Sequence, residues 1–479
     1  MSPRTAILSV LACGVFALVL FRPVRDVDMF WQVRTGELML ETGRLVTTDP
    51  FTSTHAGEPT PTIYWLSQLL YAGLLKVGSW ELLHRLDALM FAAALWLAAV
   101  GGRTRGGSPF AAAAAFGLAL LIALPHHGLR PQTFGLLGFA AVVALERSQL
   151  GPWRKALATL VLCTVWQNLH PSATTGALYL GVVAAAGFGR WVVSRGGPFP
   201  WRLGLPAAAA GLAVFLTPDG FGILRLSAEN AAVARAIGIE EWLPIWNKAT
   251  WPAARTVWLG VVVTVGLALA VRRRANWEEV AVAVVFTAAA VGVYRMSLFW
   301  AVAMIPVWCR WLEVAYPRLV TDTTTTRVRP VLVLPAVLGA ALVAVVVRPP
   351  VFDQGLPFAG LDRVRVLRVH GVVYNYREWG GPLIASAHPA VRVTIDGRLY
   401  LFPAADWDDY LRTALGEVPL SEVEARYRPD AFFLRPSYHE RLIALIRASD
   451  RWEEVYADPS CVLFVKPAGR MAGTPGPVK

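Results

Sequence analysis

Long runs of Ala, Val and Leu alternate with short polar segments over the first 350 residues of the chain. A helix needs about 20 mostly apolar residues to cross the hydrocarbon core of a bilayer. Eleven runs come near this length and predict transmembrane helices: 5–22, 82–100, 109–125, 131–145, 156–168, 174–193, 203–217, 256–271, 279–293, 296–312 and 330–347. The shortest of them, at 156–168, gives the weakest signal. The pattern predicts an α-helical polytopic membrane protein.

The remaining residues lack long apolar runs. The segments GVVYNY, RVTIDG, DAFFL and CVLFV favour strands, whereas DWDDYLRTAL and SYHERLIALIRAS have helical spacing. Strands that alternate with helices predict a small α/β domain at 349–467, after a membrane bundle at 1–348. The Gly- and Pro-rich tail at 468–479 is expected to be disordered.

Two connections between the apolar runs are unusually long and polar. The first, at 22–80, places Asp26 and Asp28 directly after the first run and continues through a Trp- and Glu-rich segment to a turn at Asp49. The second, at 217–255, contains IGIEEWLPIW, which is typical of an interfacial segment with Trp anchors. Long loops inside a compact domain are usually functional, so both are candidate parts of a site.

The charges of the short connections predict the orientation of the bundle. Lys and Arg collect in the connections after the second, fourth, sixth, eighth and tenth runs, whereas the other short connections contain few of them. Cytoplasmic loops of membrane proteins are enriched in these residues. The N-terminus is therefore expected in the cytoplasm, and the C-terminal α/β domain and both long loops are expected on the extracytoplasmic side.

The composition agrees with a membrane protein and limits the partners. Hydrophobic residues make up 55% of the chain and charged residues 16%, with 19 Trp and a mean hydropathy of +0.48. The net charge of +12 comes from Arg scattered over loops and forms no basic patch interleaved with aromatic residues. This argues against nucleic acid and favours a lipid bilayer with its phosphate headgroups. The four Cys have no spacing typical of a zinc site or a disulfide framework.

Most chemically reactive side chains near the membrane are expected on the extracytoplasmic face. Ionisable groups at membrane depth are costly and are therefore functional candidates. Carboxylates can accept a proton, Arg can bind a phosphate, and His can do either. The candidates are Asp26, Asp28, Asp49, His126, His127, Arg130, His170, Glu240, Glu241 and Arg295.

Asp28 is the first choice for a catalytic base and Asp26 the second. Together the two carboxylates offer hard oxygen ligands, which suit a divalent cation. The alternative is that both end the first span and pair with Arg22 or Arg25. Asp49 is also a natural turn former, and the remaining candidates could simply anchor helix ends.

The first long loop also carries a resemblance. DVDMFWQVRTGELMLETGRLVTTDPFTST resembles the first outer loop of bacterial multi-span proteins in the GT-C glycosyltransferase superfamily, a largely uncharacterised group with an outer α/β domain. Further motifs similar to that group follow in the same order: GLRPQTFGLL, WQNLH, LTPDGFGIL with IEEWLP, YRMSLFWAVAMIP, and NYREWGGPLI with VTIDGRLYLF.

The resemblance implies transfer of a sugar from a polyprenyl-phosphate donor to a glycan, lipid or protein acceptor at a bacterial plasma membrane. It implies a catalytic carboxylate at Asp26 or Asp28. The chain departs from the pattern of that group at three places. Gln32 stands where the group has His, Ile63-Tyr64 stands where it has His-Glu, and Met296 stands where it has Asn. These substitutions keep a catalytically inactive cell-envelope scaffold open as an alternative.

A transporter of a lipid-linked substrate is a third class. It would need polar groups at mid-span depth on several helices, whereas here they lie near the ends of the runs.

Overall fold

The computed structural model describes residues 2–101, 107–194, 198–317, 339, 341–347 and 351–467. Ten of the predicted apolar runs are helices, and the eleventh is described only at 339 and 341–347, where it is helical. The expected disordered tail at 468–479 lies outside the described residues. The ten helices are α1 (Pro3–Leu20), α4 (Trp80–Val100), α5 (Pro109–Ala123), α6 (Gln132–Glu146), α7 (Pro152–Leu169), α8 (Ala173–Ser194), α9 (Trp201–Ala213), α11 (Trp251–Val271), α12 (Trp277–Gly292) and α13 (Ser297–Ala315).

The described helices include six that are long and apolar enough to cross a membrane: Pro3–Leu20, Trp80–Val100, Pro109–His126, Ala173–Ser194, Trp251–Val271 and Tyr294–Ala315. The helix Gln132–Glu146 is apolar but shorter. The chain is therefore a mostly helical membrane protein. The full number of eleven spans stays a prediction.

Helix α13 lies at the centre of the bundle and is buried along nearly its whole length. It packs against α5, α12 and α11. Close contact with α11 depends on Gly260, where an added Cβ would lie 2.7 Å from the Trp300 ring. Trp308 donates to Thr264 of α11 across 2.8 Å, which satisfies its indole N–H inside the bundle.

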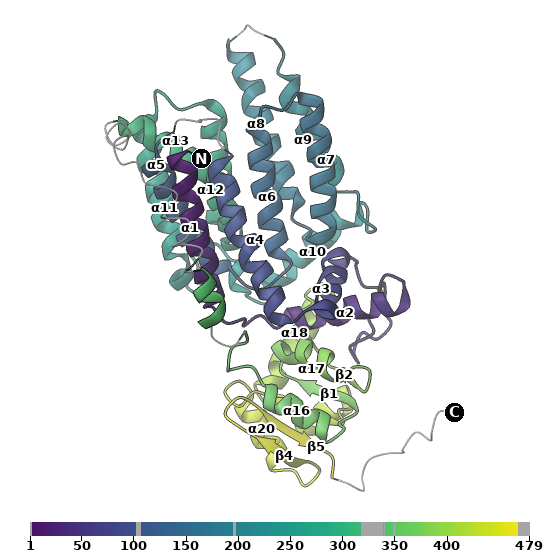
Figure 1. Cartoon of the computed structure of the whole chain (residues 1–479). Helices are drawn as coiled ribbons and strands as arrows, with labels where there is room; N and C mark the ends of the chain where they lie inside the picture. Colours follow the sequence, from purple (N-terminus) through teal and green to yellow (C-terminus); the bar gives the residue numbers. More distant parts are fainter. Residues whose placement is uncertain are drawn as a thin grey trace.

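The two long loops fold over one end of the bundle. Helices α2 (Asp28–Thr42) and α3 (Trp65–Val77) come from the first loop, and α10 (Gly222–Ala236) with the 3-10 turn η2 (Glu240–Trp242) from the second. In Figure 1, α2 and α3 lie between the helical bundle and the sheet domain. Asp219 joins the two loops because its carboxylate accepts from the N–H and the hydroxyl of Thr62.

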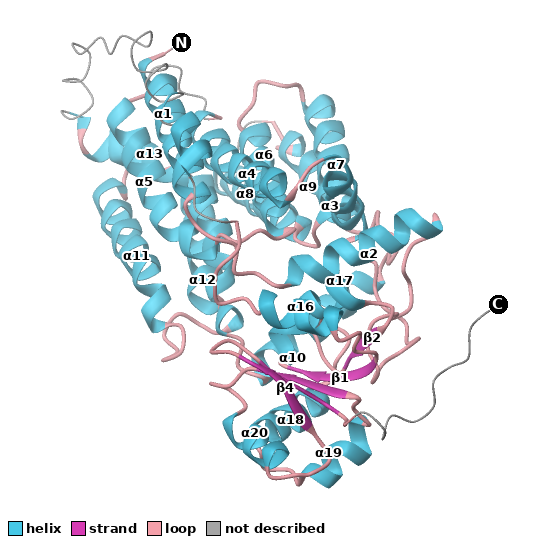
Figure 2. Cartoon of the chain, turned by 60° about the horizontal axis from the view of Figure 1, so that its bottom comes forward, coloured by secondary structure: helices cyan, strands magenta, loops and turns pink. Residues whose placement is uncertain are grey.

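The C-terminal domain has a five-stranded sheet in the order β2-β1-β3-β5-β4. Strands β2, β1 and β3 are parallel, and β5 and β4 are antiparallel to their neighbours. Figure 2 shows α16 and α17 on one side of the sheet and α18, α19 and α20 on the other. The elements are α16 (Phe358–Val366), β1 (Gly371–Asn375), α17 (Gly380–Ala387), β2 (Val391–Val393), α18 (Ala404–Ala414), α19 (Leu420–Tyr427), β3 (Ala431–Leu434), α20 (Glu440–Arg447), β4 (Glu453–Ala457) and β5 (Val462–Val465).

Alternating residues of the central strands fill two separate cores. Tyr374 and Phe432 pack with α18 and α20, whereas Val373 and Phe433 pack on the opposite face. This second core also contains Trp31 and Phe51 from the first long loop. The loop therefore shares buried apolar surface with the C-terminal domain.

Backbone contacts hold this junction together. The Ser53 N–H donates to the Val393 carbonyl at 2.9 Å, and the Val393 N–H donates to the Phe51 carbonyl at 3.1 Å. At the start of α17 an added Cβ on Gly381 would meet the Val27 carbonyl, which explains why the chain has glycine there. The C-terminal domain is thereby docked on the bundle end that carries Asp28.

Candidate functional site

A cavity of about 100 Å³ lies where the first loop, the second loop and the C-terminal domain meet the bundle. It contains five of the ten residues predicted from the sequence, and these come from five separate parts of the chain. They are Asp28, Arg130, His170, Glu241 and Arg295. The other lining residues are Trp31, Gln32, Tyr64, Pro131, Gln132, Asn230, Trp242, Gly397, Arg398, Leu399 and Tyr400.

Asp28 is the first residue of α2, where the helix dipole favours a negative charge. Its backbone N–H donates to Asp26 Oδ1 at 2.9 Å, and the Trp31 indole N–H donates to Asp28 Oδ1 at 3.2 Å. Gly397 of the C-terminal domain lies against this carboxylate, because an added Cβ there would overlap Asp28 Oδ1. Burial raises the pKa of Asp28 to about 6, and the neighbouring carboxylates Asp396 and Glu241 add to the increase.

Two guanidinium groups face the same cavity and share one carboxylate. Arg295, in the turn before α13, donates from Nη1 to Glu241 Oε1 at 2.7 Å, and Arg130 Nη1 lies 3.9 Å from Glu241 Oε2. Burial raises the pKa of Glu241, but Arg295 and Arg130 outweigh it, so this pKa lies below its usual range. Glu241 is therefore ionised and occupies the position of an anion between two cations.

Within the part of the chain that the structure describes, three polar atoms on the cavity wall have no hydrogen-bond partner. They are Gln132 Nε2, Asn230 Oδ1 and Trp242 Nε1, all buried. Native proteins pair most buried polar groups, so each such atom needs an explanation. A polar ligand in the cavity would supply their missing partners.

Arg398 lines the cavity but is held by two carboxylates of its own. It makes a bidentate pair with Asp396, at 2.9 and 2.6 Å, and its Nη1 lies 2.7 Å from Asp49 Oδ1. Asp49 also accepts from the N–H groups of Phe51 and Thr52. These three side chains connect the turn of the first loop to the strand ends of the C-terminal domain.

His170 directly follows α7, and its Nδ1 shares a hydrogen bond of 2.7 Å with Ser172 Oγ. Burial lowers the pKa of His170 well below its usual value, so the ring is neutral. It packs 5.7 Å from the Tyr64 ring. A neutral His at this place can form hydrogen bonds but adds no positive charge.

The other predicted residues lie outside the cavity. Asp26 forms an ion pair with Arg130, His126 contacts Ser297 Oγ at 2.7 Å, and His127 contacts Asp87 at 2.7 Å. Glu240 is exposed, unlike its neighbour Glu241, and Asp49 is buried in the pair with Arg398. The consecutive polar residues of the turn before α6 therefore separate toward different helices.

Asp26 and Asp28 provide few ligands for the divalent cation that the sequence suggested. Both oxygens of Asp26 are engaged, one by the Asp28 N–H and one by Arg130. The described residues contain no group of three His, Cys, Asp or Glu side chains that could hold a metal ion. The donor set does not fit a divalent cation.

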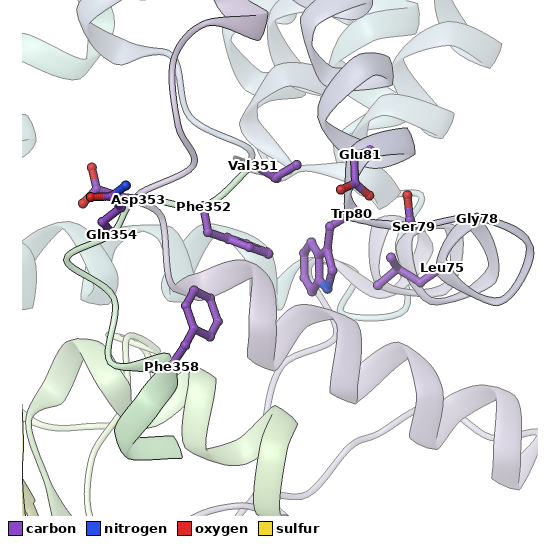
Figure 3. A pocket seen from close by; sticks show the side chains of 10 residues that line it. All are labelled: Leu75, Gly78, Ser79, Trp80, Glu81, Val351, Phe352, Asp353, Gln354 and Phe358. Atoms are coloured by element: carbon purple, nitrogen blue, oxygen red, sulfur yellow. The ribbon is translucent and has the colours of Figure 1, made fainter. Parts of the chain in front are cut away.

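A larger hollow of about 700 Å³ lies between the α3–α4 turn and the segment 351–358. Figure 3 shows its aromatic lining, with Trp80, Phe352 and Phe358 grouped together. It contains none of the predicted site residues. Trp80 begins a membrane helix, which is the usual place of an interfacial aromatic anchor.

The comparisons with known proteins agree with this architecture. The chain resembles the crystal structure of the Archaeoglobus fulgidus oligosaccharyltransferase tethered to an acceptor peptide containing the NVT sequon. The TM-score is 0.57 at 12% sequence identity, over 92% of this chain and 71% of that one. No protein-family model matches, and neither does any curated protein. The chain thus shares its overall fold with that oligosaccharyltransferase, and the similarity concerns architecture alone.

Sequence reasoning missed several residues of the cavity. Asn230 lies outside every motif, whereas Tyr64 and Tyr400 lie in motifs of the resemblance but were not singled out as site residues. Only the folding of three distant regions brings them together. Trp242 was expected as an interfacial anchor, but its ring lies 5.5 Å from the Arg295 guanidinium. The IEEWLP motif was the one signal that pointed to it.

Proposed function

We propose that the chain is a membrane glycosyltransferase that moves a sugar from a polyprenyl-phosphate donor to an acceptor outside the cytoplasm. The observation that carries the proposal is the cavity itself. It combines a carboxylate of raised pKa, Asp28, with two guanidinium groups and unpartnered polar atoms. The GT-C-like fold supports the same class of reaction.

In this proposal the Asp28 carboxylate accepts the proton of an acceptor hydroxyl. The acceptor oxygen bonds to the anomeric carbon as the bond from that carbon to the donor phosphate oxygen breaks. Arg130 and Arg295 stabilise the negative charge of the departing polyprenyl phosphate. The phosphate replaces the Glu241 carboxylate that pairs with both of them.

The test follows the release of polyprenyl phosphate. Purified chain in proteoliposomes receives polyprenyl-phosphate-linked hexoses and pentoses together with a cell-envelope extract as acceptor. Asp28→Asn removes the base and is expected to lower turnover by about 10²-fold or more. The control Asp353→Asn changes a carboxylate that pairs with Arg25 outside the cavity, and it should retain turnover. Equal rates for the two variants would remove Asp28 from the mechanism.

The inactive scaffold is the second candidate, because one observation favours it. Each of the three arginines in the cavity already pairs with a carboxylate of the chain: Arg130 with Asp26, Arg295 with Glu241 and Arg398 with Asp396. A scaffold would bind no polyprenyl phosphate and would release none from any donor in the same assay.

A further inference from the structure

A second polar cavity lies at the other end of the bundle. Its volume is about 400 Å³, and it is bordered by the first turn of α1, the ends of α6 and α13, and the start of α12. In Figure 1 the start of α1 lies at the end of the bundle away from the sheet domain. This cavity is separate from the site that contains Asp28.

Its lining includes four arginines and four glutamates. Half of these charges form ion pairs within the described part of the chain. Arg190 lies 3.0 Å from Glu278, and Arg310 lies 2.9 Å from Glu279. Glu313 accepts from the backbone N–H of the residue before α5 at 2.8 Å. These groups therefore have partners without any ligand.

Arg147 is different. It follows the last residue of α6, and its Nε is buried without a hydrogen-bond partner among the residues that the structure describes. Among the described residues it makes no ion pair, and its contact is with the Tyr179 hydroxyl. Arg4 borders the same cavity and donates from Nη2 to the Ala99 carbonyl at 2.8 Å. A guanidinium with an unused buried N–H is costly unless an anion binds it.

We propose that this cavity binds a phosphate group between Arg147 and Arg4. The fork of a guanidinium matches phosphate oxygens well. A volume of about 400 Å³ lies in the range of small-molecule sites, so it admits a headgroup as well as free phosphate.

The experiment uses the full chain in detergent and native mass spectrometry. The probes are dioctanoyl phosphatidylglycerol, the matching dioctanoylglycerol without phosphate, and inorganic phosphate as a competitor. Arg147→Gln is compared with Arg273→Gln, which removes an exposed positive charge from the loop after α11.

The phosphate-bearing lipid is expected to bind better than dioctanoylglycerol. Arg147→Gln should weaken its binding about tenfold, because a charged hydrogen bond is lost, and Arg273→Gln should leave it unchanged. If inorganic phosphate displaces the lipid, free phosphate is sufficient for binding at the site. If inorganic phosphate does not displace the lipid, the site binds the lipid headgroup. Both results support the site.

Equal binding of the two lipids, or equal effects of the two substitutions, would overturn the proposal. If Arg147→Gln does not fold, Arg147→Lys keeps the charge but removes the fork, and it should bind the phosphate-bearing lipid severalfold more weakly than the unchanged chain. If Arg147→Lys binds the phosphate-bearing lipid as tightly as the unchanged chain does, the proposal is overturned as well.

Discussion

Removing Arg398 should undock the C-terminal domain from the first loop. The side chain of Arg398 is 3% exposed, and those of its partners Asp49 and Asp396 are 0% exposed. Arg398→Gln leaves two buried carboxylates without a counter-charge. Breaking one buried ion pair typically costs about 3–5 kcal/mol. The junction should therefore open more often by a factor of roughly 10² to 10⁴.

Hydrogen exchange of the full chain in detergent measures this opening. The reporter amides are those of Ser53 and Val393, which bridge the first loop and β2. Arg392→Gln is the matched control, because Arg392 lies on β2 next to the reporter Val393 and its side chain is exposed. Exchange at the two reporters should accelerate in Arg398→Gln and stay unchanged in Arg392→Gln. Equal exchange in both variants would refute the role of the buried pairs.

Three further predictions concern the cavity. Turnover should fall as the pH drops through about 6, because the base is the ionised form of Asp28 and burial raises the pKa of this carboxylate from its usual value of about 4. A pH profile that is still flat at pH 5 would contradict this. Glu241→Gln should bind polyprenyl phosphate about tenfold more tightly in equilibrium binding, because a competing anion is lost, whereas the exposed Glu240→Gln should not. Gly397→Ala should lower turnover without lowering expression, because the new methyl group displaces the Asp28 carboxylate; unchanged turnover would show that the contact is unimportant.

The helices of the bundle were predictable because their signal is local. An apolar run identifies a membrane helix without knowledge of its neighbours. Strand β4 was missed because it is a polar edge strand, and Glu453 and Glu454 at its start are exposed. Helix α17 was missed because its start is Gly380-Gly381-Pro382, which is unfavourable for a helix until it packs between α2 and the sheet.

The site was predictable only in part, because its geometry depends on distant contacts. His126, His127 and Arg130 are neighbours in sequence, yet they contact α13, α4 and the cavity respectively. The role of Arg398 depends on Asp49, which lies far away in the chain. Residue type and the expected membrane side identified the candidates. Only the fold selects among them.

The most direct test is a density map of the chain with bound polyprenyl phosphate. We expect the phosphate between Arg130 and Arg295, in the place of the Glu241 carboxylate and in the cavity that contains Asp28. A phosphate bound elsewhere, with Glu241 still paired to both arginines, would contradict the proposed function.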